Sequence, residues 1–84
     1  MSMAVREKIR VAVIFGPGER IAPVWFEWRQ RKHTVCETTY QWTDRQGSET
    51  CLHFSVSDGF GLYELVYHTE ARVWRLLELQ PDYR

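Results

Sequence analysis

Cysteine and histidine side chains are the residues of this 84-residue chain with the most obvious potential for chemistry. Thiolate sulfur and imidazole nitrogen are the usual ligands of zinc, so these residues raise the hypothesis of a metal site. The candidates are His33, Cys36, Cys51 and His53. The chain has no Cys-x-x-Cys pair, and the spacing of His33 and Cys36 sends them to opposite faces of a strand. Only Cys51 and His53 share a face by spacing, and we therefore expect no metal ion and no other cofactor.

Catalytic arrangements find no better support. Cys51 and His53 could pair as nucleophile and base, but no third residue to orient the histidine is evident, nor is an oxyanion hole. Glu64 stands alone among apolar residues, without a second carboxylate. We expect it to face outward or to pair with Arg72 or Arg75 across a hairpin. The sequence thus predicts no catalytic residues and a protein that is not an enzyme.

One local basic cluster lies beside two tryptophans. Arg29, Arg31 and Lys32 follow Trp25 and Trp28 closely in the sequence. Bases stacked on aromatic rings, with phosphates held by Arg and Lys, are the chemistry of single-strand binding. The alternative is a solvated hairpin tip with its tryptophans in the core. Eleven basic and eleven acidic residues cancel, which weakens a phosphate-binding surface.

Large rings are abundant for a chain of this size. Four Trp, four Tyr and four Phe make up 14% of the residues, and so short a chain has little room to bury them all. Exposed rings would form an apolar patch of the kind that marks a partner site. Our leading hypothesis is a non-catalytic module that docks a protein partner through aromatic surface. The alternative is single-stranded nucleic-acid binding through the Arg29–His33 hairpin and the nearby tryptophans.

Length and hydropathy bound the class of protein. Residues 1–84 suffice for one small domain with one core. The N-terminal residues lack the apolar segment of a signal peptide, and no run approaches the ~20 apolar residues of a membrane span. We expect a soluble cytoplasmic protein without a membrane partner.

Period-two alternation of apolar residues predicts the elements that position these side chains. The expected strands are residues 5–15, 20–29, 33–42, 50–57, 59–68 and 72–80. Reversals are expected at 16–18, 30–32, 44–49 and 58–59. In the first strand, Ile9, Val11, Val13 and Phe15 should face inward. Residues 59–68 form the most apolar stretch, and we expect a central strand buried on nearly both faces.

The expected fold is all-β, a six-stranded antiparallel meander curled into a small, partly open barrel. The C-terminal segment, residues 70–80, leaves an alternative open. Its apolar residues also fit a helical stripe, which Thr69 could cap. Residues 81–84 should form a short tail.

Aromatic residues at fixed positions also resemble a known family. Phe26-Glu27-Trp28-Arg29 is followed by Thr34-Val35, Trp42, His53-Phe54-Ser55-Val56, Gly61-Leu62-Tyr63-Glu64-Leu65 and Trp74-Arg75-Leu76. Over about residues 23–79 this pattern resembles a small uncharacterised bacterial domain. That domain occurs alone and appended to proteins related to Y-family, error-prone DNA polymerases. The resemblance implies a non-catalytic all-β module with a link to DNA repair, and it transfers no catalytic residues.

Overall fold

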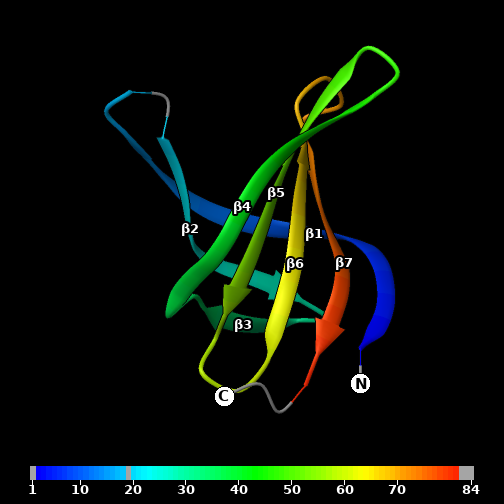
Figure 1. Ribbon diagram of the computed structural model, residues 1–84. Coiled ribbons are helices and arrows are strands. Elements are labelled where there is room, and N and C mark those ends of the chain that lie inside the picture. The colour runs from blue at the N-terminus through cyan, green and yellow to red at the C-terminus, as the bar shows by residue number, and fades with distance from the viewer. Residues whose placement is uncertain (1, 19, 82–84) are drawn as a thin grey trace.

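The computed structural model of this protein describes residues 2–18 and 20–81. They form seven strands, shown in Figure 1. These are β1 (Met3–Gly16), β2 (Arg20–Trp28), β3 (Arg31–Thr34), β4 (Glu37–Gln46), β5 (Glu49–Ser57), β6 (Leu62–His68) and β7 (Val73–Gln80). The predicted all-β class is confirmed, with one strand more than expected. Within this described part of the chain, no helix is long and apolar enough to cross a membrane.

The strands form one antiparallel sheet in the order β3-β2-β1-β7-β6-β5-β4. Strand β1 is long enough to pair with two strands, one along each half of its length. Its first half, from Met3 to Ile9, pairs with β7, and its second half, from Arg10 to Gly16, pairs with β2. The sheet therefore bends along β1, and β2 and β3 fold back over the other strands.

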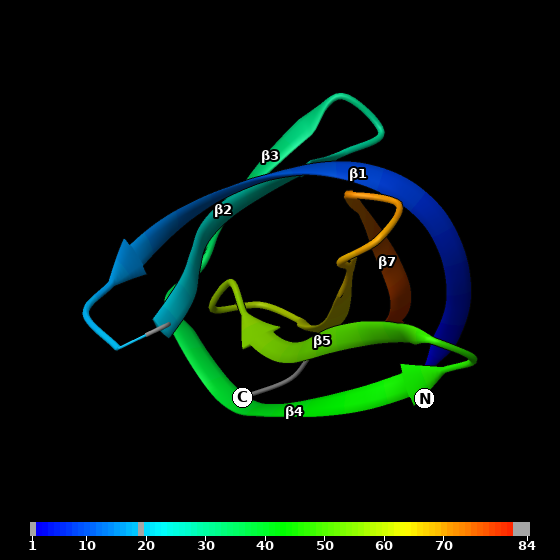
Figure 2. The same ribbon diagram turned by 90° about the horizontal axis from the view of Figure 1, so that it is seen from above.

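A two-residue link explains the curvature of the sheet. Strands β3 and β4 occupy opposite edges, yet only Val35 and Cys36 separate them in the chain. Because two residues span less than about 10 Å, the two edges must approach each other at this end. The Val35 amide donates to the carbonyl of Val24 (3.0 Å), and the Cys36 amide donates to the carbonyl of Ser57 (2.7 Å). The result is the half-barrel seen from above in Figure 2.

The expected single strand over residues 33–42 is wrong, because the chain breaks at this link and begins β4 at Glu37. The reversal expected at residues 30–32 is also misplaced. The chain turns at Arg29 and Gln30, whose φ angles of 51° and 65° are those of a type I′ hairpin. The expected loop at residues 44–49 shortens to Gly47-Ser48, since β4 runs on to Gln46.

The C-terminal segment is a strand, and its helical alternative is wrong. Strand β7 pairs with β6 on one side and with β1 on the other, which satisfies its backbone without a helix. The tail expected at residues 81–84 falls mostly outside the described residues.

The core lies between the folded-back strands and the main sheet. Its centre comprises Phe26, Phe54, Val56, Tyr63, Leu65 and Leu76. The expected central strand begins at Leu62 rather than at residue 59, and its middle is buried on both faces, with Leu65 at 0% and Val66 at 1% exposure. Ile9 and Val11 pack against the core as expected. Phe15 does not, since it lies near the β1–β2 hairpin tip and is 74% exposed.

Phe26 is the residue through which β2 joins this core, and it is fully buried. Phe26→Ala should lower the free energy of unfolding by about 3–5 kcal/mol, since the cavity adds to the lost transfer energy. The matched control Phe15→Ala should change it by less than about 0.5 kcal/mol. Urea denaturation measures both, and equal losses would contradict the assigned core.

Candidate functional site

The five side chains predicted to form a binding cluster do not stay together. They lie on the β2–β3 hairpin, where Trp25 and Trp28 are three residues apart on one strand and so face opposite ways. Glu27 pairs with Lys32, and Trp28 pairs with Arg31. Lys32 therefore accompanies Trp25 on the surface away from the core, whereas Arg31 accompanies Trp28 on the core side.

Trp28 and Arg29 are held by Glu7 of β1. The indole Nε1 of Trp28 donates to Glu7 Oε1 (2.9 Å), and Arg29 Nη2 donates to Glu7 Oε2 (2.7 Å). The guanidinium also lies over the Trp28 ring, 4.7 Å from its centroid. The hydrogen bonds from Arg29 and then Trp28 lower the pKa of Glu7, and the Glu7 carboxylate raises the pKa of Arg29. These two predicted residues thus already have a partner within the chain.

Trp25 and Lys32 belong to a different surface. The Lys32 ammonium lies 4.9 Å from the centroid of the Trp25 ring. Trp25 also lines a groove of about 470 Å³ at the junction of β1, β2 and β7. The other lining residues are Lys8, Ile9, Arg10, Val11, Ala12, Arg72, Val73 and Trp74. We call this surface the basic groove. Its cations were not predicted as a group, although the Lys8-x-Arg10 spacing places two of them on one face of a strand.

A third cluster surrounds the carboxylate of Asp58 in the β5–β6 loop. Its Oδ1 accepts from the amides of Phe60 (2.9 Å) and Gly61 (2.8 Å). Its Oδ2 accepts from the hydroxyl of Tyr63 (3.0 Å) and contacts Nδ1 of His33 (3.0 Å). Burial alone would raise the pKa of Asp58, but these hydrogen bonds outweigh it and lower the pKa to about 2. Burial, followed by the Asp58 contact, raises the pKa of Tyr63 to about 12.

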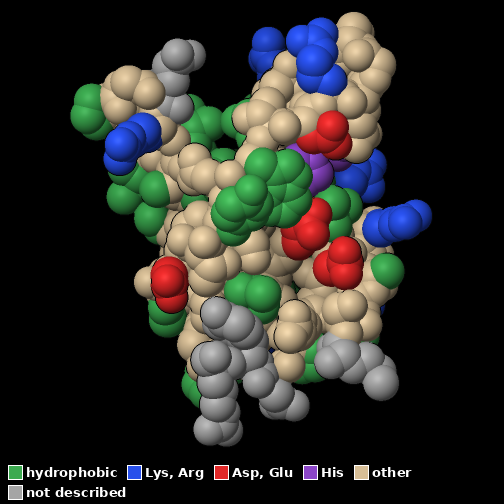
Figure 3. Space-filling model, in the orientation of Figure 1, with side chains coloured by type: hydrophobic (Ala, Val, Ile, Leu, Met, Phe, Trp, Pro, Cys, Tyr) green, Lys and Arg blue, Asp and Glu red, His purple; other side chains and the backbone are tan. Residues whose placement is uncertain are grey.

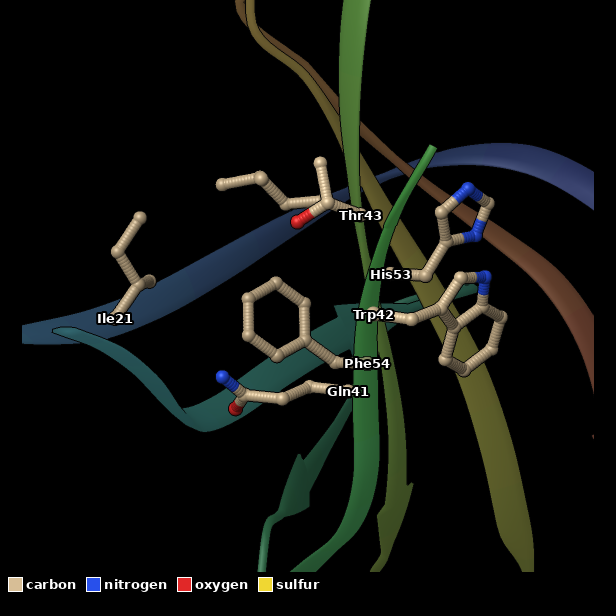
Figure 4. A pocket seen from close by; sticks show the side chains of 7 residues that line it. Ile21, Gln41, Trp42, Thr43, His53 and Phe54 are labelled. Carbon is tan, nitrogen blue, oxygen red and sulfur yellow. The ribbon is translucent and has the colours of Figure 1, made fainter. Parts of the chain in front are cut away.

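The face of strands β4–β7 turned away from the core, which we call the outer face, is unusually polar for its burial. His53 is only 6% exposed, and its ring stacks on Trp42 with centroids 4.8 Å apart. Figure 4 shows both rings on one side of β4 and β5, with Phe54 on the other. The nitrogens of His53 lie 3.7 Å from Asp44 and 3.5 Å from Glu64, without a hydrogen bond. Figure 3 shows histidine and acidic side chains together on this side of the molecule.

Glu64 faces outward, as one of the two expectations had it, but it contacts a histidine rather than Arg72 or Arg75. The strand register places Arg75 opposite Val66, and it places Glu78 opposite Glu64. On β5 the residue directly opposite Glu64 is Ser55, and Glu64 reaches diagonally to His53, at 3.5 Å.

Cys51 and His68 form a contact on the same outer face. The sulfur of Cys51 lies 3.5 Å from Nδ1 of His68, and Oε1 of Glu49 lies 3.1 Å from that same nitrogen. Burial, followed by the nearby charges of Glu49 and Asp44, raises the pKa of the Cys51 thiol. Such a thiol stays protonated near neutral pH. Because sulfur and carboxylate meet one nitrogen instead of flanking the ring, the group does not form a nucleophile–base–acid relay.

The free edge of β4 borders an opening in the half-barrel. A cavity of about 200 Å³ lies there, lined by Ile21, Gln41, Trp42, Thr43, Leu52, His53 and Phe54. In Figure 4, Phe54 and Gln41 point from β5 and β4 toward the side where Ile21 lies on β2. We call this space the side opening. Its walls combine apolar side chains with the amide of Gln41.

The exposed rings are not the tryptophans, which are all partly buried. Tyr40 is 66% exposed, Phe15 74% and Phe60 80%. These three rings lie on β4, near the β1–β2 hairpin tip and in the β5–β6 loop. Only Tyr40 lies beside a second ring, with its centroid 5.3 Å from that of Trp42.

Comparison with models of protein families, with curated proteins and with solved structures yields no match to this chain.

The Asp58 cluster makes stability depend on acid. Because the folded pKa of about 2 lies below the ordinary value of 3.8, unfolding takes up a proton as the pH falls. The contribution of Asp58, about 2 kcal/mol, should be complete above about pH 5 and lost progressively toward pH 2. Asp58→Asn should therefore lower stability at pH 7 and flatten the decline in acid. Urea denaturation across this pH range measures it.

Glu7 and Glu49 also have lowered pKa values, so part of the acid-induced decline should survive in Asp58→Asn. Asp44→Asn, which alters a carboxylate that is 48% exposed, should retain the full decline. If Asp58→Asn behaved like Asp44→Asn, the assigned role of Asp58 would be wrong.

Proposed function

We propose that this protein is a non-catalytic binding module that docks an extended segment of a protein partner along strand β4. One observation carries this proposal. Among the described residues, β4 pairs only with β5, so its other edge presents unpaired backbone groups. After an irregularity between Thr38 and Tyr40, residues Tyr40–Gln46 keep an uninterrupted register. Seven such residues are long enough to template an added strand, whereas the other edge, β3, has only four residues.

Side chains on both faces of β4 could recognise the added segment. The exposed Tyr40 and its neighbour Trp42 offer rings on the outer face. The side opening offers a recess of mixed polarity, with Leu52 and Phe54 in its wall beside Gln41. In strand addition, backbone hydrogen bonds provide affinity and alternate side chains in pockets provide specificity. Charged side chains on an edge strand discourage pairing with another strand. The segment Tyr40–Gln46 has only two of them, Asp44 and Arg45.

The resemblance to domains appended to proteins related to error-prone polymerases suggests where to seek the partner. We place it among DNA-repair proteins and the module in the cytoplasm. Both assignments form part of this proposal.

Display of random peptides on phage, selected against the whole protein, tests strand addition. Selected peptides should shift the backbone amide NMR signals of β4 and of the strand residues bordering the side opening. Tyr40→Ala should weaken their binding about tenfold, the loss expected for one aromatic anchor worth about 1.4 kcal/mol. Tyr40 is mostly exposed, so the fold should survive the change.

Phe60→Ala is the matched control, because Phe60 is also mostly exposed, at 80% against 66% for Tyr40, but lies in the β5–β6 loop. It should leave peptide binding unchanged. Shifts that avoid β4, or equal effects of the two variants, would refute docking along this strand.

The basic groove favours a second candidate, single-stranded nucleic-acid binding. Two partly buried tryptophans, Trp25 and Trp74, line it together with Lys8, Arg10 and Arg72. Rings for stacking beside cations for phosphates are what such binding requires. Glu27 offsets part of the charge, since it pairs with Arg10 at 3.4 Å. The site we propose therefore keeps Trp25 of the predicted cluster, with Lys32 beside its ring, and it leaves out Trp28 and Arg29, which Glu7 engages.

Titration of a fluorescent single-stranded oligonucleotide at low and moderate salt tests this candidate. Affinity should fall steeply with salt because phosphate contacts release counterions. Trp25→Ala should weaken binding by about 1–3 kcal/mol, the value of one stacked base, and Arg72→Ala should reduce the salt dependence. Arg29→Ala should change little, since Glu7 already engages Arg29. Absence of binding at low salt would exclude nucleic acid as the ligand.

A further inference from the structure

Three side chains of different chemistry converge on the outer face at the far end of β5. Glu49 and Cys51 are two residues apart on β5 and so share a face. The register of β5 and β6 places His68 directly opposite Cys51. A carboxylate oxygen, a sulfur and an imidazole nitrogen all lie within 4.8 Å of one another there.

Two of the three separations between these atoms are close to the edges of a metal-centred tetrahedron, and the third lies within 4.8 Å. Zinc binds sulfur at about 2.3 Å and nitrogen or oxygen at about 2.0–2.1 Å. Tetrahedral angles then put sulfur about 3.6 Å from nitrogen, and nitrogen about 3.3 Å from oxygen. The observed distances are 3.5 Å from Cys51 Sγ to His68 Nδ1 and 3.1 Å from His68 Nδ1 to Glu49 Oε1.

Hydrogen bonding within the group cannot satisfy all three atoms. Nδ1 of His68 carries at most one proton. If it has the proton, it can donate well to only one of the two neighbouring atoms. If it lacks the proton, it can accept from the Cys51 thiol but then faces a Glu49 oxygen that has no proton to share. A cation at the centre of the group would satisfy sulfur, nitrogen and oxygen together.

The surroundings hold the candidate ligands in place. The second oxygen of Glu49, Oε2, accepts from the amides of Glu70 (3.1 Å) and Ala71 (3.0 Å). Cys51 is completely buried. Outer partners that fix a ligand carboxylate in this way are typical of metal sites.

A cavity beside the group leaves room for a fourth ligand. It has a volume of about 460 Å³, and its lining includes His68, His53, Arg6 and Arg75. His53 is 6% exposed, and neither of its ring nitrogens has a hydrogen-bond partner. Its nitrogens lie 3.7 Å from Asp44 and 3.5 Å from Glu64 without forming a hydrogen bond, and a buried polar group of this kind calls for an explanation.

We infer that Glu49 Oε1, Cys51 Sγ and His68 Nδ1 bind a zinc ion, with the fourth coordination position open toward this cavity. Three protein ligands with an open position differ from the closed four-ligand site of a structural zinc. The set also differs from the four residues weighed in the sequence, since only Cys51 belongs to both. This site is independent of the docking strand and of the basic groove.

Cobalt(II) substitution tests the site, because a cobalt–thiolate bond gives a charge-transfer absorption and tetrahedral cobalt absorbs strongly in the visible. The protein is first freed of metal by dialysis against a chelator and then titrated with cobalt(II). Both absorptions should appear during the titration and reach their maximum at one cobalt ion per chain. Zinc should then displace the cobalt. Cys51→Ser should lose the charge-transfer absorption.

The chain provides a matched control in its second cysteine. Cys36 is exposed and free, so Cys36→Ser should bind cobalt like the unaltered protein. His68→Gln removes a ligand without touching the buried sulfur, and it keeps the test decisive even if Cys51→Ser does not fold. It should weaken zinc binding more than about 100-fold, because loss of an outer partner alone costs 10–100-fold. Absence of the thiolate absorption, or its loss in Cys36→Ser but not in Cys51→Ser, would overturn the inference.

Discussion

The carboxylate of Asp58 is the interaction on which the closed end of the half-barrel depends. It receives two amides of its own loop and the hydroxyl of Tyr63, and it contacts His33 of β3. The His33 ring in turn stacks on Phe26 at 4.8 Å, which ties this charged group to the core. One partly buried charge thus shapes a loop and joins the folded-back strands to the main sheet. At the other end of β5, the Glu49 carboxylate joins only β5 to the β6–β7 turn, and the side opening lies between β4 and β2.

Much of this architecture could be predicted, because alternation of apolar residues depends only on which face is buried. The alternating positions of Phe54 and Val56, and of Leu65 with its neighbours, predict β5 and β6 in this way. The break at Val35-Cys36 could not be predicted, since no Gly or Pro marks it. It arises because these two amides bond to Val24 and Ser57, which are distant in sequence. The turn at Arg29-Gln30 could not be predicted either, because type I′ turns usually contain Asn or Gly at these positions.

The candidate sites were harder to predict because they depend on register. The three-residue spacing of Trp25 and Trp28 already implied that the two rings face apart. The meeting of Cys51 with His68, however, follows from the four-residue loop between β5 and β6, whose length fixes which residues pair. The sequence also predicted a loop at residues 44–49. For this reason Glu49 was not expected on the same strand face as Cys51, two residues later. Metal ligands from neighbouring strands leave no compact motif in a sequence.

Strand β1 has a consequence for how the chain folds. All other strand pairs join neighbours in sequence, but β1 meets β7, as in the pairing of Met3 with Leu79. Forming this pair closes a loop of nearly the whole chain, which carries the largest entropic cost of any pairing in the sheet. It raises the contact order, so docking of β1 should come late and limit the folding rate. A circular permutant with its ends joined beside β1 and β7, and opened between β3 and β4, would have only sequential hairpins and should fold faster.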